Sequence, residues 1–189
     1  MSNQIILSGT TGVEASGDTQ NEQLFSARVS ISDGALDTSY GNAGINIVSN
    51  VISHQSANAS TIDENDTLWL SGRFNDGYTS INDLSVSSDD LSMNVLQLQN
   101  GVQANKFLSA SIAQLNTNNK LVLTRYSSAG IIDTSFSLDG SKALNINVAF
   151  KTITLKELSD GSIIIAGTLI NGLNEEGFIA KVDQDGYLD

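Results

Sequence analysis

The apolar residues of this chain are gathered into short segments, many of them rich in β-branched side chains. Gly, Asn or Asp borders most of these segments, and clear examples lie at residues 5–7, 68–70, 121–123, 153–155 and 163–165. Runs of this length with such borders are typical of β-strands. Apolar and polar residues also alternate over 25–31 and 145–148, which indicates two further strands that are buried on one face.

Two stretches of the apolar pattern are also compatible with helices. One carries Leu91, Val95 and Leu98, and the other carries Phe107, Ala110 and Leu115. We predict strands in both places, because the internal repeat described below aligns them with clearer strands.

Turns in this chain depend on Gly, Asn and Asp, because proline is absent. The pairs Asn-Gly and Asp-Gly favour the tight turns that join antiparallel strands. They occur at residues 100–101, 160–161, 171–172 and 185–186, at the intervals expected of hairpins.

An internal repeat organises the whole chain. Residues 33–40, DGALDTSY, return as residues 129–136, AGIIDTSF, and the start of the motif returns once more as residues 185–189, DGYLD. A strand that carries a cation precedes each copy, so that Arg28 lies nine residues before Asp37. Arg125 lies eight residues before Asp133, and Lys181 lies eight residues before Asp189.

A second strand recurs ahead of each motif, at residues 4–9, 67–72, 106–111 and 162–167. We therefore predict one all-β repeat domain over residues 1–189, with units near residues 3–65, 66–100, 101–160 and 161–189. The second unit is degenerate, and the last one is cut short after Asp189.

These motifs resemble the bacterial delta-60 repeats. Residues 160–167, DGSIIIAG, are similar to the first part of that repeat, and residues 124–126, TRY, and 36–41, LDTSYG, are similar to the rest. The resemblance covers most of the chain and is weakest over residues 50–100. It implies antiparallel four-stranded units of a β-propeller-like assembly, within a larger secreted or surface bacterial protein, and it implies no catalytic residues.

The physical logic of the repeat agrees with this fold. A single four-stranded unit exposes both faces, and neighbouring units bury these faces against each other. We expect the Leu or Ile and the aromatic residue of the motif to pack between units. We expect Asp37 and Asp133 to accept hydrogen bonds from nearby backbone N–H groups or to pair with Arg28 and Arg125.

Three to four units are fewer than most closed propellers contain. The chain is then part of a longer ring, a protomer that completes a ring with a partner, or an unusually small arrangement. Bare terminal strands invite uncontrolled pairing with other chains. We therefore expect either self-association or pairing of strand 5–9 with the C-terminal unit.

Charge narrows the range of partners. Nine Lys and Arg residues against 21 Asp and Glu residues give a net charge of −12. This charge disfavours nucleic acids and anionic membrane surfaces, and no apolar run is long enough to span a bilayer. The chain has no cysteine, and its richness in Ser, Thr and Asn resembles that of extracellular, cell-surface or virion-surface proteins.

Catalytic chemistry has few candidate residues. His54 is the one histidine, whereas a zinc site needs several ligands and a serine triad needs a base beside its nucleophile. The loop at residues 9–12 lacks the lysine and the helix of a phosphate-binding loop. We therefore expect His54 to be a surface or structural residue, and we expect no enzymatic activity.

Acidic residues at 183, 185 and 189 surround a glycine in a spacing that is compatible with calcium. The same segment is already explained as a copy of the repeat turn, and no bidentate Glu follows. A structural turn is the preferred interpretation, and calcium is the one cofactor left open. The acidic residues at 63–66 and 88–90 are interpreted as solvated turns.

Aromatic residues are the usual platforms for sugars, and the candidates are Trp69, Tyr78, Tyr126 and Tyr187. Trp69 lies within a repeat strand and is expected in the core, whereas Tyr78 lies on an expected loop and is the better candidate for contact with a ligand.

The leading hypothesis is a non-enzymatic binding or adhesion module of a bacterial or phage surface protein. It would recognise a glycan or a protein through loops at residues 10–23, 74–91 and 171–176. The alternatives are a polysaccharide hydrolase that uses Asp and Glu, and an architectural spacer.

Overall fold

The computed structural model describes residues 4–11, 23–48, 55–63, 68–74, 91–115, 118–146 and 149–189. Its regular structure within these ranges is β, apart from one short 3-10 helix, η1 (Gly101–Gln103). The all-β prediction is therefore confirmed, and every strand pairing is antiparallel.

The described strands form four sheets. The first sheet contains β1 (Gln4–Thr11), β2 (Gln23–Ser30) and β3 (Ile45–Val48), and the second contains β4 (Gln55–Ile62) and β5 (Leu68–Phe74). The third sheet is four-stranded, with β6 (Leu91–Gln97), β7 (Phe107–Leu115), β8 (Asn118–Tyr126) and β9 (Ser141–Leu144). The fourth contains β10 (Ala149–Glu157), β11 (Ile163–Asn171) and β12 (Asn174–Val182).

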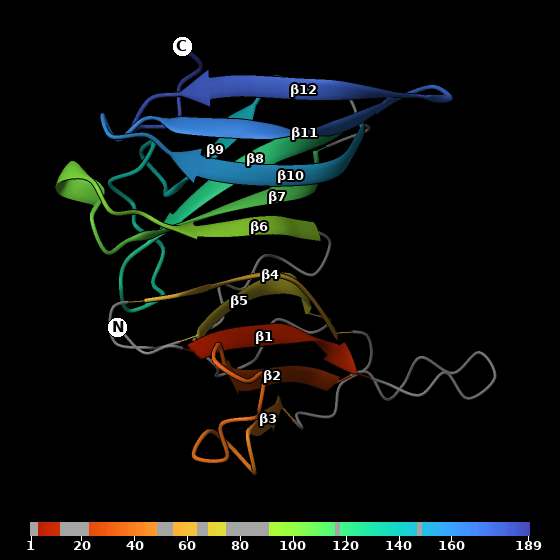
Figure 1. Cartoon of the computed structure of the whole chain (residues 1–189). Helices are drawn as coiled ribbons and strands as arrows, with labels where there is room; N and C mark the ends of the chain where they lie inside the picture. Colours follow the sequence, from red (N-terminus) through yellow and green to blue (C-terminus); the bar gives the residue numbers. More distant parts are fainter. Residues whose placement is uncertain are drawn as a thin grey trace.

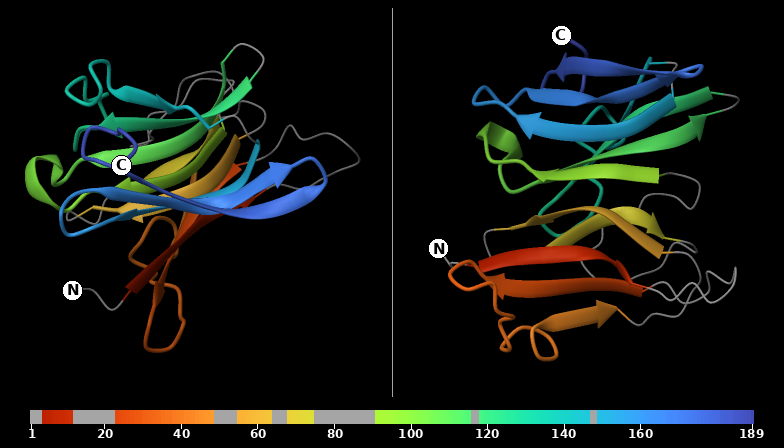
Figure 2. Two further views of the ribbon diagram at one scale, coloured as in Figure 1. Left: turned by 90° about the horizontal axis from the view of Figure 1, so that it is seen from above. Right: turned by 45° about the vertical axis from the view of Figure 1, so that its right-hand side comes forward.

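The four sheets follow one another in space in the order of the chain (Figures 1 and 2). We call the face of a sheet that points toward the preceding sheet its upstream face, and the face toward the following sheet its downstream face. The upstream face of the first sheet and the downstream face of the fourth sheet are the two outer faces of the stack. The first and fourth sheets lie at opposite ends of the stack (Figure 1). Within the described residues β1 pairs with β2 and β12 pairs with β11, so of the two expected alternatives the pairing of strand 5–9 with the C-terminal unit is not found, and self-association stays a prediction.

The four predicted repeat strands are confirmed as β1, β5, β7 and β11. The two stretches that were compatible with helices are also strands, β6 and β7. The strand expected from the alternation at 145–148 is wrong where it is described, because Asn145 and Ile146 follow the end of β9.

The sheets share an internal register. Ile5 pairs with Val29, Phe107 pairs with Tyr126 and Ile163 pairs with Val182, each at the start of the equivalent strand. The opening strands β4, β6 and β10 each contain a register irregularity, at Ala57/Ala59, Ser92/Asn94 and Phe150/Thr152 respectively. The bulges in β4 and β6 lie at the same distance from the hairpin that follows, whereas the bulge in β10 lies two residues further from it.

The sheets are offset by one strand from the units read in the sequence. The predicted units at 66–100, 101–160 and 161–189 each begin at the second strand of a sheet, namely β5, β7 and β11. The strands β4, β6 and β10 belong in each case to the end of the preceding unit, so each junction between units is bridged by backbone hydrogen bonds within one sheet.

The main hydrophobic core lies between the third and fourth sheets. The downstream face of the third sheet contributes Leu108, Ala110 and Leu123, and the upstream face of the fourth contributes Ile163 and Ile165. A smaller cluster between the second and third sheets contains Trp69, Val95, Phe107 and Tyr126. The prediction that Trp69 lies in the core is confirmed.

Candidate functional site: the repeat turn and the pocket at its last copy

The three copies of the repeat turn share one backbone hydrogen bond. In each copy the N–H of the recurring Asp donates to the carbonyl of the cationic residue, with distances of 2.8 Å for Asp37 to Arg28 and 2.8 Å for Asp133 to Arg125. The distance from Asp189 to Lys181 is 3.0 Å. This contact folds the chain back onto the strand that it has just left, and so the cation and the carboxylate meet on one face of the sheet.

The predicted contacts of Asp133 are confirmed. Its Oδ1 atom accepts hydrogen bonds from the backbone N–H and the Oγ of Ser135, at 3.1 and 2.6 Å. Its Oδ2 atom accepts from Nε of Arg125 at 2.7 Å and from Nζ of Lys106 at 2.8 Å. One carboxylate thus joins the turn, strand β8 and the residue before strand β7.

The predicted contacts of Asp37 are confirmed as well. The carboxylate accepts from the backbone N–H of Ser39 at 3.0 Å and from Nε of Arg28 at 2.9 Å. The side-chain amide of Gln4 also donates to it, in the position that Lys106 occupies in the third sheet. In the last copy Nζ of Lys181 lies 2.7 Å from Oδ2 of Asp189.

These contacts stabilise the ionised carboxylate of Asp133. Burial by itself raises the pKa of Asp133, but the hydrogen bonds from Lys106, Ser135 and Arg125 outweigh burial and hold this pKa well below its usual range. The hydrogen bonds from Ser39 likewise lower the pKa of Asp37. The charged residues of the motif are therefore engaged with one another.

The apolar residues of the motif differ from the prediction. Phe136 is buried and packs in the main core, as expected. Leu36, Ile132 and Leu188 are 43%, 48% and 51% exposed, so the prediction that this position packs between units is wrong. The reason is local, because a Cβ atom on Gly140 would lie 2.2 Å from Cγ2 of Ile132. The Ile side chain lies over the glycine of its own turn.

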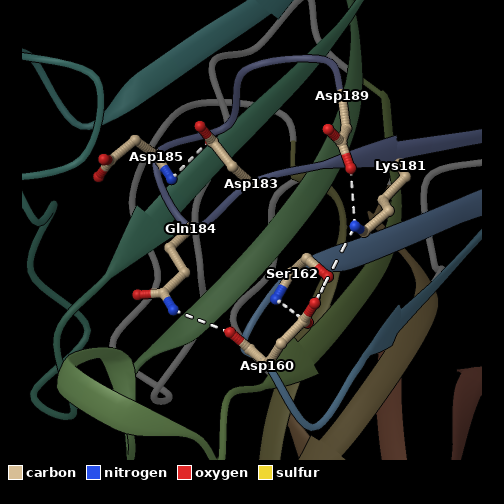
Figure 3. Close-up of a pocket in the computed structure, with 7 residues that line it drawn as sticks. All are labelled: Asp160, Ser162, Lys181, Asp183, Gln184, Asp185 and Asp189. Atoms are coloured by element: carbon tan, nitrogen blue, oxygen red, sulfur yellow. Dashed lines mark hydrogen bonds and ion pairs between the residues drawn. The ribbon is translucent and has the colours of Figure 1, made fainter.

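A pocket of about 380 Å³ lies at the last copy of the turn (Figure 3). Its lining is polar and mainly acidic, and it consists of Asp160, Ser162, Lys181, Asp183, Gln184, Asp185 and Asp189. Nζ of Lys181 lies between two carboxylates, 2.7 Å from Asp189 and 4.0 Å from Asp160 (Figure 3). The hydrogen bond to Asp189, with its charge, raises the pKa of Lys181.

Two carboxylates of the pocket accept hydrogen bonds from their own turns. Oδ1 of Asp183 accepts from the backbone N–H groups of Asp185 and Tyr187, at 3.0 and 2.8 Å. Oδ1 of Asp160 accepts from the backbone N–H of Ser162 at 2.9 Å. Among the described residues no group of three or more acidic, His or Cys side chains is arranged to hold a metal ion.

The pocket residues on the fourth sheet have equivalents on the third sheet, where the following sheet covers them. Ser162, Lys181 and Asp189 occupy the positions that Lys106, Arg125 and Asp133 have there. In the third sheet the fourth sheet covers these positions. Their side chains show the difference, since Arg125 and Asp133 are 5% and 12% exposed whereas Lys181 and Asp189 are 38% and 61% exposed.

In the third sheet, residues at and beside the positions equivalent to the pocket donate hydrogen bonds to main-chain carbonyls of the fourth sheet. Nη1 of Arg125 donates to the carbonyl oxygen of Gln184 at 3.1 Å, and Nε2 of Gln103 donates to the carbonyl oxygen of Gly161 at 2.6 Å. A Cβ atom on Gly186 would lie 2.7 Å from Cζ of Phe136, so this turn requires glycine where it meets the preceding sheet. The arrangement binds the backbone of a neighbouring β-turn.

The other candidate residues are placed as follows. The ring of Trp69 packs on Phe107 with centroids 4.2 Å apart, and its Nε1 donates to Asp63 at 3.1 Å. Tyr126 is buried, so the prediction that it is a candidate sugar platform is wrong. Tyr187 is 49% exposed, and Nζ of Lys142 lies 3.7 Å from its ring centroid. His54, Tyr78 and the acidic residues at 88–90 lie outside the described residues.

Ser162, Gln184 and Gln103 take part in these contacts between sheets and were not predicted from the sequence. The one available signal was the alignment of Ser162 with Lys106 at the start of equivalent strands, because a residue in that place reaches the Asp of the turn in the third sheet.

Comparison with family models, with curated proteins and with solved structures finds no match to this chain. In the described part of the chain no helix has the length and apolar character needed to cross a membrane.

Proposed function

We propose that this chain consists of propeller-type repeats that resemble the delta-60 repeats. The common register of the first, third and fourth sheets supports this proposal, as do the equivalent bulges in β4 and β6 and the three copies of the turn. Stacked sheets of this kind bury their faces against their neighbours, and only the two outermost faces remain free.

The proposed function is that of a non-enzymatic binding module of a bacterial or phage surface protein, with another protein as its ligand. One observation carries the choice of a protein ligand. In the third sheet, Arg125 donates to a main-chain carbonyl of the following sheet, and in the pocket at the last turn Lys181 occupies the equivalent position. A cation in that place, Lys181, is available to a carbonyl acceptor of an incoming β-turn.

A glycan is the alternative ligand, and a polysaccharide hydrolase is the alternative class. The half-exposed ring of Tyr187, which belongs to the same turn as pocket residues Asp185 and Asp189, favours the glycan. The four carboxylates of the pocket favour the hydrolase, but those of Asp160 and Asp183 accept backbone hydrogen bonds from their own turns, and that of Asp189 pairs with Lys181. This engagement is typical of structural carboxylates.

The experiment probes the chain against an array of bacterial glycans and an array of surface proteins, together with an assay for release of reducing sugar. The protein array includes this chain itself as one of its members, and we expect binding to a protein without turnover. Lys181→Glu should abolish this binding, whereas the control Lys120→Glu, on the third sheet, should leave it unchanged. Release of sugar, or binding that does not depend on Lys181, would contradict the proposal.

A further inference from the structure

The upstream face of the first sheet is apolar along all three of its strands. Side chains of directly paired residues share a face, and the register places the pairs Ile5 with Val29, Leu7 with Ala27, and Phe25 with Ile47 on one side. The opposite side faces the second sheet, because Oγ of Ser8 donates to Oγ of Ser60 at 2.8 Å. The apolar side is therefore the outer surface of the stack.

The fourth sheet carries nearly the same residues in the same places. Ile163, Ile165, Gly167, Phe178, Ala180 and Val182 correspond in register to Ile5, Leu7, Gly9, Phe25, Ala27 and Val29. In the fourth sheet these residues form the upstream face, which packs on the third sheet.

Exposure separates the two copies of this face. Ile163 and Ile165 are 2% and 0% exposed, whereas Ile5 and Leu7 are 47% and 51% exposed. The first sheet thus presents, uncovered, a surface that the same chain buries elsewhere. Because the residues match, the surface that covers the copy in the fourth sheet indicates what would cover the copy in the first.

The covering surface is the downstream face of the third sheet, and it also has an uncovered copy. Leu108, Ala110 and Leu123 are buried there, and their positions on the fourth sheet are taken by Ile164, Ala166 and Ile179. Ile179 is 73% exposed, compared with 0% for Leu123. These residues lie on the downstream face of the last sheet, beside Lys181 and the pocket.

We propose that the downstream face of the fourth sheet binds the upstream face of the first sheet of a second copy of this chain. The contact repeats the packing between the third and fourth sheets, and it rests on the proposed function, for which it names the partner. The turn at Gly34 of the second copy would meet the pocket. Around Gly34 the space for a Cβ atom is open, whereas the equivalent Gly186 is in contact with Phe136.

A head-to-tail contact of this kind is heterologous, and it either closes into a ring or continues as a filament. Each chain supplies four sheets, and two chains therefore supply a number within the range of about 4–8 blades found in closed propellers. We expect a closed pair with twice the mass of one 20.0 kDa chain.

The test uses light scattering on the 189-residue chain and on variants of each face. We expect a dimer for the unchanged chain, and monomers for Leu7→Lys and for Ile179→Asp. Both residues are exposed in the single chain, so these variants should keep its strand content by circular dichroism. Leu173→Asp is the matched control, because Leu173 is fully exposed at the β11–β12 hairpin and off both faces. It should remain dimeric.

Mixing the two monomeric variants distinguishes a head-to-tail contact from a contact between like faces. The mixture should dimerise, because one contact unites two unchanged faces and the other unites Lys with Asp. A monomer for the unchanged chain, or a mixture that stays monomeric, would overturn the inference. A monomeric chain that still binds an array ligand through Lys181 leaves the proposed function standing, whereas a monomeric chain without array binding overturns both.

Discussion

At the scale of single residues, the Asp of the repeat turn joins the turn to the strand before it through both of its carboxylate oxygens. Its short side chain accepts from a backbone N–H two residues ahead, as Asp residues do in turns, and it pairs with a cation on the preceding strand. The two complete copies differ in burial, since the side chain of Arg125 is 5% exposed and that of Arg28 is 23% exposed. The cost of breaking the pair should follow this difference.

Replacing Asp133 with Ala should lower the free energy of unfolding by about 1–3 kcal/mol, because it leaves the buried guanidinium of Arg125 without its carboxylate. Asp37→Ala should have the smaller effect of the two. Urea denaturation measures both, with Asp185→Ala as a surface control that should stay within about 0.5 kcal/mol of the unchanged chain. A loss at Asp133 as small as that of the control would show that the motif does not stabilise the fold.

The depressed pKa of Asp133 also predicts a pH dependence. The folded-state pKa lies below that of the unfolded chain, so the carboxylate stabilises the fold above about pH 4, and this contribution is lost as the pH falls toward the folded-state pKa. Asp133→Asn lacks the titrating group. The difference in free energy of unfolding between the unchanged chain and Asp133→Asn should therefore be larger at pH 6 than at pH 3. A constant difference would show that the pKa of Asp133 is not depressed.

The sequence predicted the pairs of Asp37 with Arg28 and of Asp133 with Arg125, because cation and carboxylate recur at nearly constant spacing around a turn. It did not predict that Lys106 joins the second pair. Lys106 lies 27 residues before Asp133, and its approach depends on which strands are neighbours in the sheet. The exposure of Ile132 was missed for a related reason, since an apolar residue can cover a glycine of its own turn instead of a neighbouring unit.

At the scale of elements, the contacts between successive sheets depend on glycines in the repeat turns. Gly186 and Gly34 are equivalent residues with positive φ angles of 83° and 69°, so a side chain at either position meets the same backbone strain. They differ in surroundings, because Gly186 meets Phe136 of the preceding sheet while Gly34 meets open space. Comparing substitutions at these two glycines therefore distinguishes the cost of backbone strain from the cost of lost packing between sheets.

Gly186→Ala should therefore destabilise the chain more than Gly34→Ala. Both substitutions incur the cost of a positive φ, of roughly 1 kcal/mol, and only Gly186→Ala forces Cβ to within 2.7 Å of Phe136. Urea denaturation at one fixed chain concentration measures the two losses. Equal losses would indicate that the turn of the fourth sheet does not pack against Phe136.

The strands themselves were predicted well, because β-branched runs between Asp-Gly and Asn-Gly pairs carry a strong local signal. The grouping of strands into sheets was not. The repeat in the sequence marks a strand and a turn, and the turn that closes a unit at Asp133 is followed by β9 and then by β10, which opens the next sheet. The sequence shows no difference in pattern that assigns β10 to the fourth sheet instead of the third.

At the scale of the whole molecule, the stabilising interactions are unevenly distributed. The main core unites the third and fourth sheets, and polar contacts reinforce it, since Glu157 accepts from the backbone N–H of Gln99 at 2.6 Å. In the first sheet Ala27 is the buried apolar residue among those described. Burial of apolar surface stabilises by about 25 cal/mol per Å², so the first sheet should open at a lower free energy than the third and fourth.

Amide hydrogen exchange should show this gradient, with slow exchange at Leu123 and Ile165 and faster exchange at Val29. The proposed contact with a second copy adds a dependence on concentration, because it covers the first sheet. Raising the chain concentration should slow exchange at Val29 and leave Leu123 unchanged, since Leu123 is already buried within one chain. Moderate salt is needed in these measurements, because two chains of net charge −12 repel each other at low ionic strength.

In Ile179→Asp the exchange at Val29 should be fast at every concentration. Uniform protection of all four sheets in that variant would contradict the gradient, and protection of Val29 that ignores concentration would count against the head-to-tail contact.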